Sequence, residues 1–178
     1  PDYANSKENI AKDMEKIKAA GFTDIIVDVR PTTGDVLFNT NVVDQVKRMD
    51  VWGNSGYSYY ERTETWDYLQ AFIEEARIQG LKVNASINTF VGGYLCPYNL
   101  GHDGVLFRDE SKKGWASVAN LADGLTNTMD LLDDETDYGA KFFNPANDDV
   151  QNFVLQLLAD LAKYDLDGII LDRCRYDC

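Results

Sequence analysis

The stretch FFNPANDDVQNFVLQLLADLAKYDLDGIILD, residues 142–172, decides the expected fold, because in it a helix pattern leads directly into a strand pattern. Apolar residues recur at helical spacing from Val150 to Leu161, with Asn144 as the expected N-cap and Pro145 at the first helical position. The run from Gly168 to Asp172 then predicts a short strand. A helix followed closely by a strand is the repeating unit of α/β proteins.

The same order of elements occurs twice more toward the N-terminus. In the first copy, Ser6 is the expected N-cap and Gly21 ends the helix before a strand at 24–30. In the second copy, a helix that begins near Thr65 leads to a strand at 82–88. The sequence therefore predicts three parallel strands, each preceded by a helix.

The connections that follow these strands are much longer than those that precede them. They span residues 31–64 and 89–143, and the second is expected to contain a hairpin formed by 105–108 and 115–118. Sites of parallel α/β folds lie at the carboxyl ends of the strands, where such loops gather. We interpret the two loops as substrate-binding structure; the alternative is insertions without a function. Three parallel strands leave open edges, so we expect residues 1–178 to be part of a larger barrel or to be completed in another way.

Composition excludes several classes of partner. The chain has 178 residues and a formal net charge of −13, so phosphate backbones and anionic membrane surfaces would repel it, and nucleic acid is not an expected partner. No apolar run approaches the about 20 residues that a membrane-spanning helix needs. Three cysteines and a single histidine do not form a metal-ligand set, so we expect no metal and no cofactor. Calcium binding by the acidic run at 130–137 is the alternative.

Alternation along the strands assigns the side chains to two faces. Ile25, Val27 and Val29 share an apolar face that should meet helices, and the other face is polar. The polar residues of the three strands gather toward their carboxyl ends; they are Asp28, Arg30, Asn84, Ser86, Asn88 and Asp172. We interpret this set as a site. The alternative is a structural network, for instance an internal ion pair between Asp28 and Arg30.

Asp172 is the strongest candidate for a catalytic group. A carboxylate at the end of a strand can act as a nucleophile or as a proton donor, depending on its neighbours. Arg173, Arg175 and Tyr176 follow it and are expected to bind sugar hydroxyls or an acidic sugar. A surface ion pair of Asp172 with an arginine is the structural alternative.

Aromatic side chains in the long loops are suited to sugar rings, because the CH-rich face of a sugar stacks on an aromatic ring. Trp52 in the first loop and Tyr94 in the second are the expected substrate-binding residues of this kind. Loop aromatic residues also commonly pack only against their own loop.

Three segments resemble the glycoside-hydrolase-like family ten over almost the whole chain. They are GFTDIIVDVRPTTGDVLF (21–38), WDYLQAFIEEARIQGLKVNASINTF (66–90) and the segment 142–177. The resemblance implies an α/β fold, a parallel (β/α)8 barrel of the TIM type, in which this chain is part of one catalytic domain and supplies strands two to four. It also implies a secreted, periplasmic or cell-surface lipoprotein, because family members are commonly found there.

The resemblance also implies roles for residues. Its catalytic carboxylate falls on Asp172, but the adjacent position, often a second acid in the family, is Arg173 here. Arg30, Pro31 and Asn88 match positions that look like substrate-binding positions. The expected function is hydrolysis of glycosidic bonds in a poly- or oligosaccharide. The alternative is a carbohydrate-binding protein without a complete catalytic pair.

The second carboxylate of such a pair is left open by the sequence. Asp28 lies two strands from Asp172, which at about 4.8 Å per strand is compatible with an inverting pair, and an acid on a later strand is the alternative. The oligomeric state, the sugar and the linkage are not indicated by any pattern in the chain.

Overall fold

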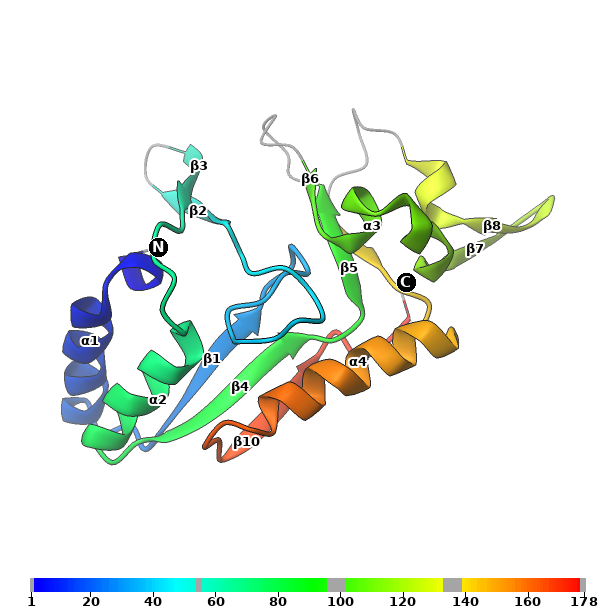
Figure 1. Ribbon diagram of the computed structural model, residues 1–178. Coiled ribbons are helices and arrows are strands. Elements are labelled where there is room, and N and C mark those ends of the chain that lie inside the picture. The colour runs from blue at the N-terminus through cyan, green and yellow to red at the C-terminus, as the bar shows by residue number, and fades with distance from the viewer. Residues whose placement is uncertain (1, 54–55, 96–101, 133–138, 177–178) are drawn as a thin grey trace. The chain divides into compact units, whose positions relative to one another are not determined.

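The structure is a computed structural model that describes residues 2–53, 56–95, 102–132 and 139–176 (Figure 1). Its helices and strands follow one another in the order η1 Asp2–Asn5, α1 Lys7–Ala19, β1 Asp24–Arg30, β2 Arg48–Gly53, β3 Gly56–Glu61, α2 Tyr68–Ile78, β4 Lys82–Asn88, β5 Val91–Leu95, β6 His102–Asp103, α3 Val105–Arg108, η2 Glu110–Trp115, β7 Val118–Leu121, β8 Gly124–Asn127, η3 Thr128–Leu131, β9 Gly139–Phe142, α4 Asp148–Leu161 and β10 Gly168–Asp172, where η denotes a 3-10 helix.

The chain forms two compact units, each built from segments that are distant in sequence. Unit 1 consists of Pro1–Val29, Val36–Ile87 and Asp160–Ile170, and unit 2 of Arg30–Asp35, Asn88–Ala159 and Leu171–Cys178. The carboxyl ends of β1, β4 and β10 therefore belong to unit 2, whereas most of each strand belongs to unit 1.

The three predicted strands are confirmed with the expected bounds. They form one sheet in the order β1-β4-β10. The N–H of Lys82 donates to the carbonyl of Thr23 at 2.9 Å, so β1 and β4 begin at the same end of the sheet. The N–H of Asp167 likewise donates to the carbonyl of Val83 at 2.8 Å where β10 begins, and the three strands are parallel.

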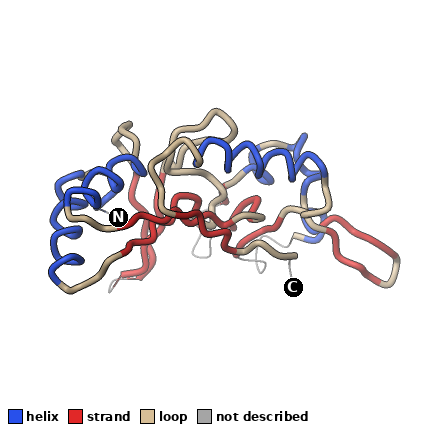
Figure 2. The backbone as a smooth tube through the Cα atoms, turned by 90° about the horizontal axis from the view of Figure 1, so that it is seen from below, coloured by secondary structure: helices blue, strands red, loops and turns tan. Residues whose placement is uncertain are grey.

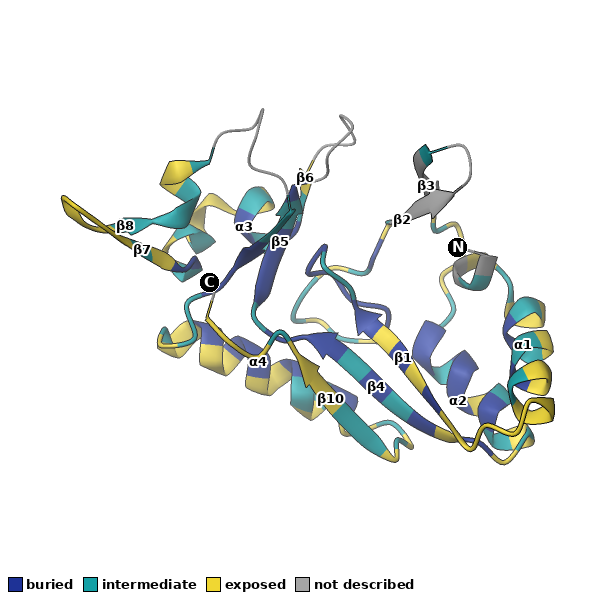
Figure 3. Ribbon diagram, turned by 180° about the vertical axis from the view of Figure 1, so that it is seen from behind, coloured by how far each residue is buried: buried dark blue, intermediate teal, exposed yellow. Residues whose placement is uncertain are grey.

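The expected (β/α)8 barrel is wrong. Closing a barrel requires the outer strands to find partners, yet within the described residues β1 and β10 each pair only with β4. The face that a barrel would enclose is open instead: Ile26 and Asp28 on β1 and Ile170 on β10 are exposed, as Figure 3 shows along these strands. The fold is a mixed α/β structure with an open three-stranded parallel sheet and separate antiparallel sheets.

Antiparallel pairs occupy the two long loops. In the described residues β2 pairs with β3, β5 pairs with both β6 and β9, and β7 pairs with β8. The hairpin expected at 105–108 and 115–118 is wrong, because α3 and η2 occupy most of that stretch and the hairpin is β7 with β8. Figures 1 and 2 show the β7–β8 ribbon projecting from the other elements of unit 2.

The core of unit 1 lies between the sheet and the two helices that precede β1 and β4. Ile25 and Val27 are buried as expected, and α1 and α2 pack against each other. Ser6 caps α1 by accepting a hydrogen bond from the N–H of Asn9 at 3.2 Å, which confirms its expected role. The expected start of α2 near Thr65 is wrong by three residues, because the side chain of Asp67 is the N-cap.

The start of α4 in unit 2 also differs from the expectation. Asn147, not Asn144, accepts hydrogen bonds from the first helical N–H groups, those of Asp149 at 2.9 Å and Val150 at 3.2 Å. Asn144 instead accepts from the N–H of Ala146 in the preceding turn. An asparagine side chain can serve either a turn or a helix N-terminus, so the sequence pattern alone does not choose between them.

Tyr164 ties three segments of unit 1 together after α4. Its hydroxyl donates to Oδ2 of Asp67 at 2.5 Å and accepts from the N–H of Asn39 at 2.8 Å. Burial, together with the hydrogen bond to Asp67, raises the pKa of Tyr164 above its ordinary value. The hydroxyl therefore connects the start of α2 to the loop that follows β1.

Tyr164→Phe is expected to lower the free energy of unfolding by about 1 kcal/mol, because the half-buried carboxylate of Asp67 and the exposed N–H of Asn39 each lose a hydrogen-bond partner. Chemical denaturation measures the change. Tyr176→Phe is the matched control: this ring is 61% exposed, and its replacement should change stability by less than about 0.5 kcal/mol. Equal stability of the two variants would remove the connecting role of Tyr164.

Candidate functional site

Arg30 lies at the end of β1, in unit 2, and is completely buried. Its guanidinium donates to the carbonyl of Asn88, at the end of β4, and to the carbonyl of Val91 at 2.6 Å. The guanidinium carbon lies 5.9 Å from the ring centre of Phe143 and 5.7 Å from that of Phe153. Carbonyl oxygens and aromatic faces thus stabilise a charge that burial would otherwise penalise.

Asn88 completes this arrangement from the neighbouring strand. Its side chain is 5% exposed, and its Nδ2 donates to the carbonyl of Arg30 at 2.8 Å. Arg30 and Asn88 therefore bond to each other in both directions, and we call this pair the strand-end clamp. The structure places these two predicted substrate-binding residues side by side, in contacts that brace the backbone.

Asp172 ends β10 and is exposed. Its Oδ1 accepts a hydrogen bond from the N–H of Arg173 at 2.7 Å, and its backbone carbonyl accepts from the N–H of Thr89 at 2.8 Å. Among the described residues, no ion pair joins Asp172 to an arginine. One carboxylate oxygen is held by the backbone, and Oδ2 is open to a ligand.

The residues after Asp172 present polar and aromatic groups to solvent. Arg173 is half-buried, and Arg175 and Tyr176 are exposed. Arg173 has φ +47°, the left-handed region that a side chain with a Cβ rarely adopts. Backbone in sparsely populated conformations is concentrated at functional sites, so the conformation of Arg173 marks this turn as a candidate site.

An ion-pair network of Asp35, Arg108 and Asp103 in unit 2 was not predicted from the sequence. Arg108 of α3 donates through both terminal nitrogens to the carboxylate of Asp35, with Nη1 at 2.8 Å from Oδ2, and its Nη1 lies 3.8 Å from Oδ1 of Asp103. The side chain of Asp35 is only 6% exposed. Asp35 ends the turn Thr-Thr-Gly-Asp that follows β1, and this position could have marked it as a candidate site residue. No pattern in the sequence pairs Asp35 with Arg108.

Tyr94 lies beside this network, because its strand pairs with the strand that holds Asp103. It is half-buried in β5, and in the sheet register it is opposite Asp103 on one side and Ala140 on the other. Gly104, which follows Asp103, has φ +107°, and the backbone of Thr33 approaches it closely. A Cβ at this position would lie 2.5 Å from the carbonyl oxygen of Thr33, so only glycine fits here.

Two further predicted site residues are placed elsewhere. Asp28 is exposed on β1 in unit 1, and its expected proximity to Asp172 stays a prediction. Trp52 lies in β2, opposite Tyr57, and its side chain is outside the described part of the chain. The acidic run expected as the alternative calcium site falls largely on residues 133–138, which are also outside the described ones.

A metal-ligand cluster and a membrane-spanning helix are both absent from the described residues. No group of three or more His, Cys, Asp or Glu side chains there is arranged to hold a metal ion. No helix in the same residues is both long and apolar enough to cross a membrane.

Substitutions at Arg173 separate its backbone conformation from its guanidinium. Arg173→Gly is expected to be about 0.5–1 kcal/mol more stable than Arg173→Ala, because glycine adopts positive φ without the penalty that a Cβ brings. Chemical denaturation of the two variants measures this difference. If Arg173→Ala were the more stable variant, the left-handed conformation would carry no strain.

The chain has sequence and structural likenesses to longer proteins. No family model matches it. It is 30% identical over 179 residues to an S-layer-related protein of Niallia circulans, in a match that covers 96% of this chain and 10% of that protein. The chain therefore spans about a tenth of the length of the curated relative that it matches.

Two solved structures share its fold. An α-L-fucosidase, isoenzyme 2, from Paenibacillus thiaminolyticus superposes with a TM-score of 0.57 at 19% identity, over 94% of this chain and 20% of that one. A hypothetical protein from Ruminiclostridium thermocellum superposes with a TM-score of 0.56 at 12% identity, over 97% of this chain and 73% of that one. At these identities the likeness shows the fold alone: the chain has an α/β fold that also occurs within a fucosidase.

Proposed function

We propose that this chain belongs to a cell-surface or secreted protein that hydrolyses glycosidic bonds, with Asp172 as a catalytic carboxylate. The observation that carries the proposal is the presentation of Asp172, at the end of a parallel strand, exposed, and with one oxygen oriented by the N–H of Arg173. The S-layer-related relative supports the location, and the fold shared with a fucosidase supports the substrate class. The resemblance to the glycoside-hydrolase-like family ten is part of this proposal.

The chemistry that Asp172 can perform depends on its protonation state. As a carboxylate it can attack the anomeric carbon or deprotonate a water molecule, and as a carboxylic acid it can protonate the leaving oxygen. Glycoside hydrolysis of the common kind needs a second carboxylate, for which Asp28 is the candidate from the sequence. Arg175 and Tyr176 are exposed and can donate hydrogen bonds to sugar hydroxyls, and the ring of Tyr176 offers a face for stacking.

A test is to incubate the protein that carries this chain with a panel of poly- and oligosaccharides, fucosylated ones included, and to measure newly formed reducing ends. Release from at least one substrate is expected. The same panel, immobilised, reports binding independently of cleavage. Absence of both binding and release across the panel would contradict the proposal.

Carbohydrate binding without hydrolysis is the second candidate, and one observation favours it. The position beside Asp172 holds Arg173, whose guanidinium cannot act as a second acid, and the turn is rich in groups that bind sugars without reacting with them. Retention of a glycan without any release of reducing ends would support this candidate over the hydrolase.

A further inference from the structure

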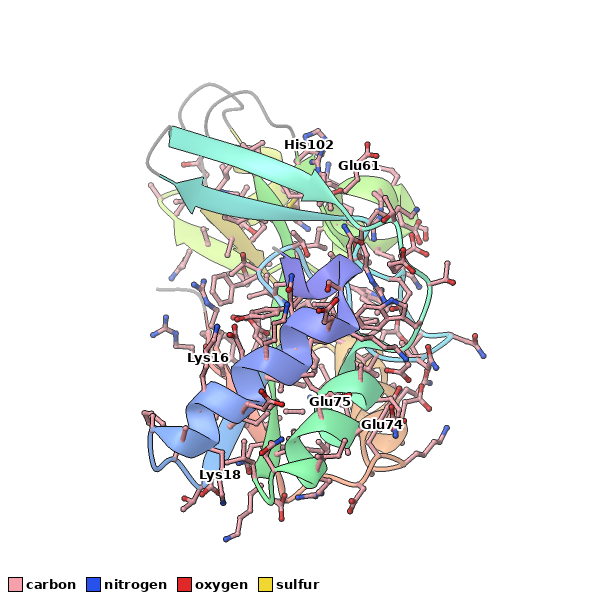
Figure 4. All side chains as sticks on the ribbon, turned by 90° about the vertical axis from the view of Figure 1, so that its left-hand side faces the viewer. Lys16, Lys18, Glu61, Glu74, Glu75 and His102 are labelled. Atoms are coloured by element: carbon pink, nitrogen blue, oxygen red, sulfur yellow. The ribbon has the colours of Figure 1, made fainter. Side chains whose placement is uncertain are left out.

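A cleft of about 420 Å³ lies in unit 1 beside the outer strand β1. Its apolar wall comes from Met14 and Ile17 of α1, Phe72 of α2 and residues 25–27 of β1. Met14 is 3% exposed and Phe72 7% exposed, so these side chains form the floor, whereas Ile26 is 65% exposed at the rim. Figure 4 shows α1 and α2 side by side, with Lys16 on the flank of α1 away from α2.

Three successive residues of β1, Ile25, Ile26 and Val27, line the cleft. Because successive side chains of a strand point to opposite faces, we place the cleft along the strand edge and not over one face. Thr23 bonds toward β4 through its carbonyl, and peptide groups alternate along a strand. The peptide groups of Ile25 and Val27 therefore point to β4, and that of Ile26 points to the edge, where the described residues provide no further strand.

The charges around this edge select the kind of occupant. Asp24 and Asp28 are exposed on the same face of β1 as Ile26, one on each side of it. At the rim, Lys16 is already paired with Asp13 at 2.7 Å, and the phenol of Tyr3 donates to Asp13 as well. A second copy of β1 in antiparallel register about Ile26 would set aspartates opposite aspartates, which is unfavourable.

We propose that β1 and its cleft bind an extended, cationic segment of a partner polypeptide by strand addition. The peptide groups of that segment would pair with the edge of β1, and alternate apolar side chains would fill the cleft over Met14 and Phe72. Its other face would place lysines or arginines near Asp24 and Asp28. The strongly acidic chain, with a net charge of −13, would attract such a segment over a longer range.

The probe for this proposal is the peptide TKLVVKT with blocked ends. In an extended strand its two lysines, at positions 2 and 6, lie on one face, and its leucine and second valine, at positions 3 and 5, lie on the other. We expect it to bind and to slow amide hydrogen exchange at Ile26, the peptide group that faces the edge, by about tenfold. TELVVET should bind about tenfold more weakly, because glutamates replace the lysines near Asp24 and Asp28. TKLPVKT should not bind, because proline lacks the N–H that strand addition uses.

Two variants of the chain locate the binding. Ile26→Lys replaces an exposed side chain at the rim and should weaken TKLVVKT by about tenfold or more, by repulsion and by loss of the apolar contact. Ile170→Lys, on the other outer strand and 37% exposed, is the matched control and should bind like the parent chain. Equal binding of the lysine and glutamate peptides, no binding of either, or sedimentation as a dimer joined at β1 would each overturn the proposal.

Discussion

Asp172→Asn is expected to lower the hydrolysis of a glycoside by about 10²- to 10⁴-fold while the protein folds as before. The amide keeps an oxygen in the place of Oδ1, so it still accepts the hydrogen bond from the N–H of Arg173. It has neither the negative charge of a nucleophile nor a proton that it can give to a leaving oxygen. Loss of a covalent nucleophile costs more, so a larger decrease would indicate that role. Turnover is measured by the release of reducing ends from whichever glycan the parent protein cleaves.

The matched control for this variant is Asp123→Asn, an equally conservative change at an exposed aspartate in the turn between β7 and β8. It should leave turnover unchanged. Thermal denaturation of both variants checks that the fold is preserved, and glycan binding should survive in both. If Asp172→Asn kept normal turnover but unfolded more easily, the residue would have a structural role, and the hydrolase would need another carboxylate.

Local pattern was sufficient to predict the parallel strands. The β-rich runs are short and bounded by glycine or aspartate, and each ends in a polar residue, so β1, β4 and β10 have the bounds expected from the sequence. Helix starts were less well determined. Asp67 caps a helix that was expected to begin near Thr65, and Asn147 caps one for which Asn144 was the expected N-cap, because several side chains near a helix start are capable of capping it.

The barrel could not be judged from the same patterns. The alternation of apolar and polar residues in β1 is the same for a strand that lines an enclosed interior and for one with an open face. Whether the outer strands close on each other depends on pairings between distant segments, which no run of residues encodes. The antiparallel sheets in the long loops depend on such pairings too, for example β5 with β9.

The sequence predicted residues of the candidate site, but it did not predict the contacts that these residues make. Arg30 and Asn88 do lie together, but the direction of a guanidinium is set by what surrounds it, here carbonyls and two phenylalanine rings. The ion pair of Asp35 with Arg108 joins residues 73 positions apart, and neither stands in a recognisable motif. The structure gives the contacts of Arg30 and Asn88 within the protein, and their substrate-binding roles stay predictions.

Arg30→Met is expected to lower the free energy of unfolding by about 2–4 kcal/mol. Methionine fills much of the same space and can lie against Phe143 and Phe153, but it donates no hydrogen bond. The buried carbonyls of Asn88 and Val91 would lose their donor, at a cost of about 1–3 kcal/mol each. Methionine carries no charge, so it escapes the cost of burying a guanidinium, and this offsets part of the loss. Chemical denaturation measures the difference.

Arg30→Lys and Arg175→Met complete this experiment. Lysine keeps the charge, but its single ammonium group lacks the planar fork that serves two carbonyls. The stability of Arg30→Lys should therefore fall between those of Arg30→Met and the parent chain. Arg175 is exposed, and Arg175→Met should change stability by less than about 0.5 kcal/mol. If Arg30→Met instead folded with full stability and lost only glycan binding, Arg30 would be a substrate contact. A group that holds three strand segments together cannot be removed without loss of stability. Full stability of Arg30→Met would therefore show that the strand-end clamp does not stabilise the fold.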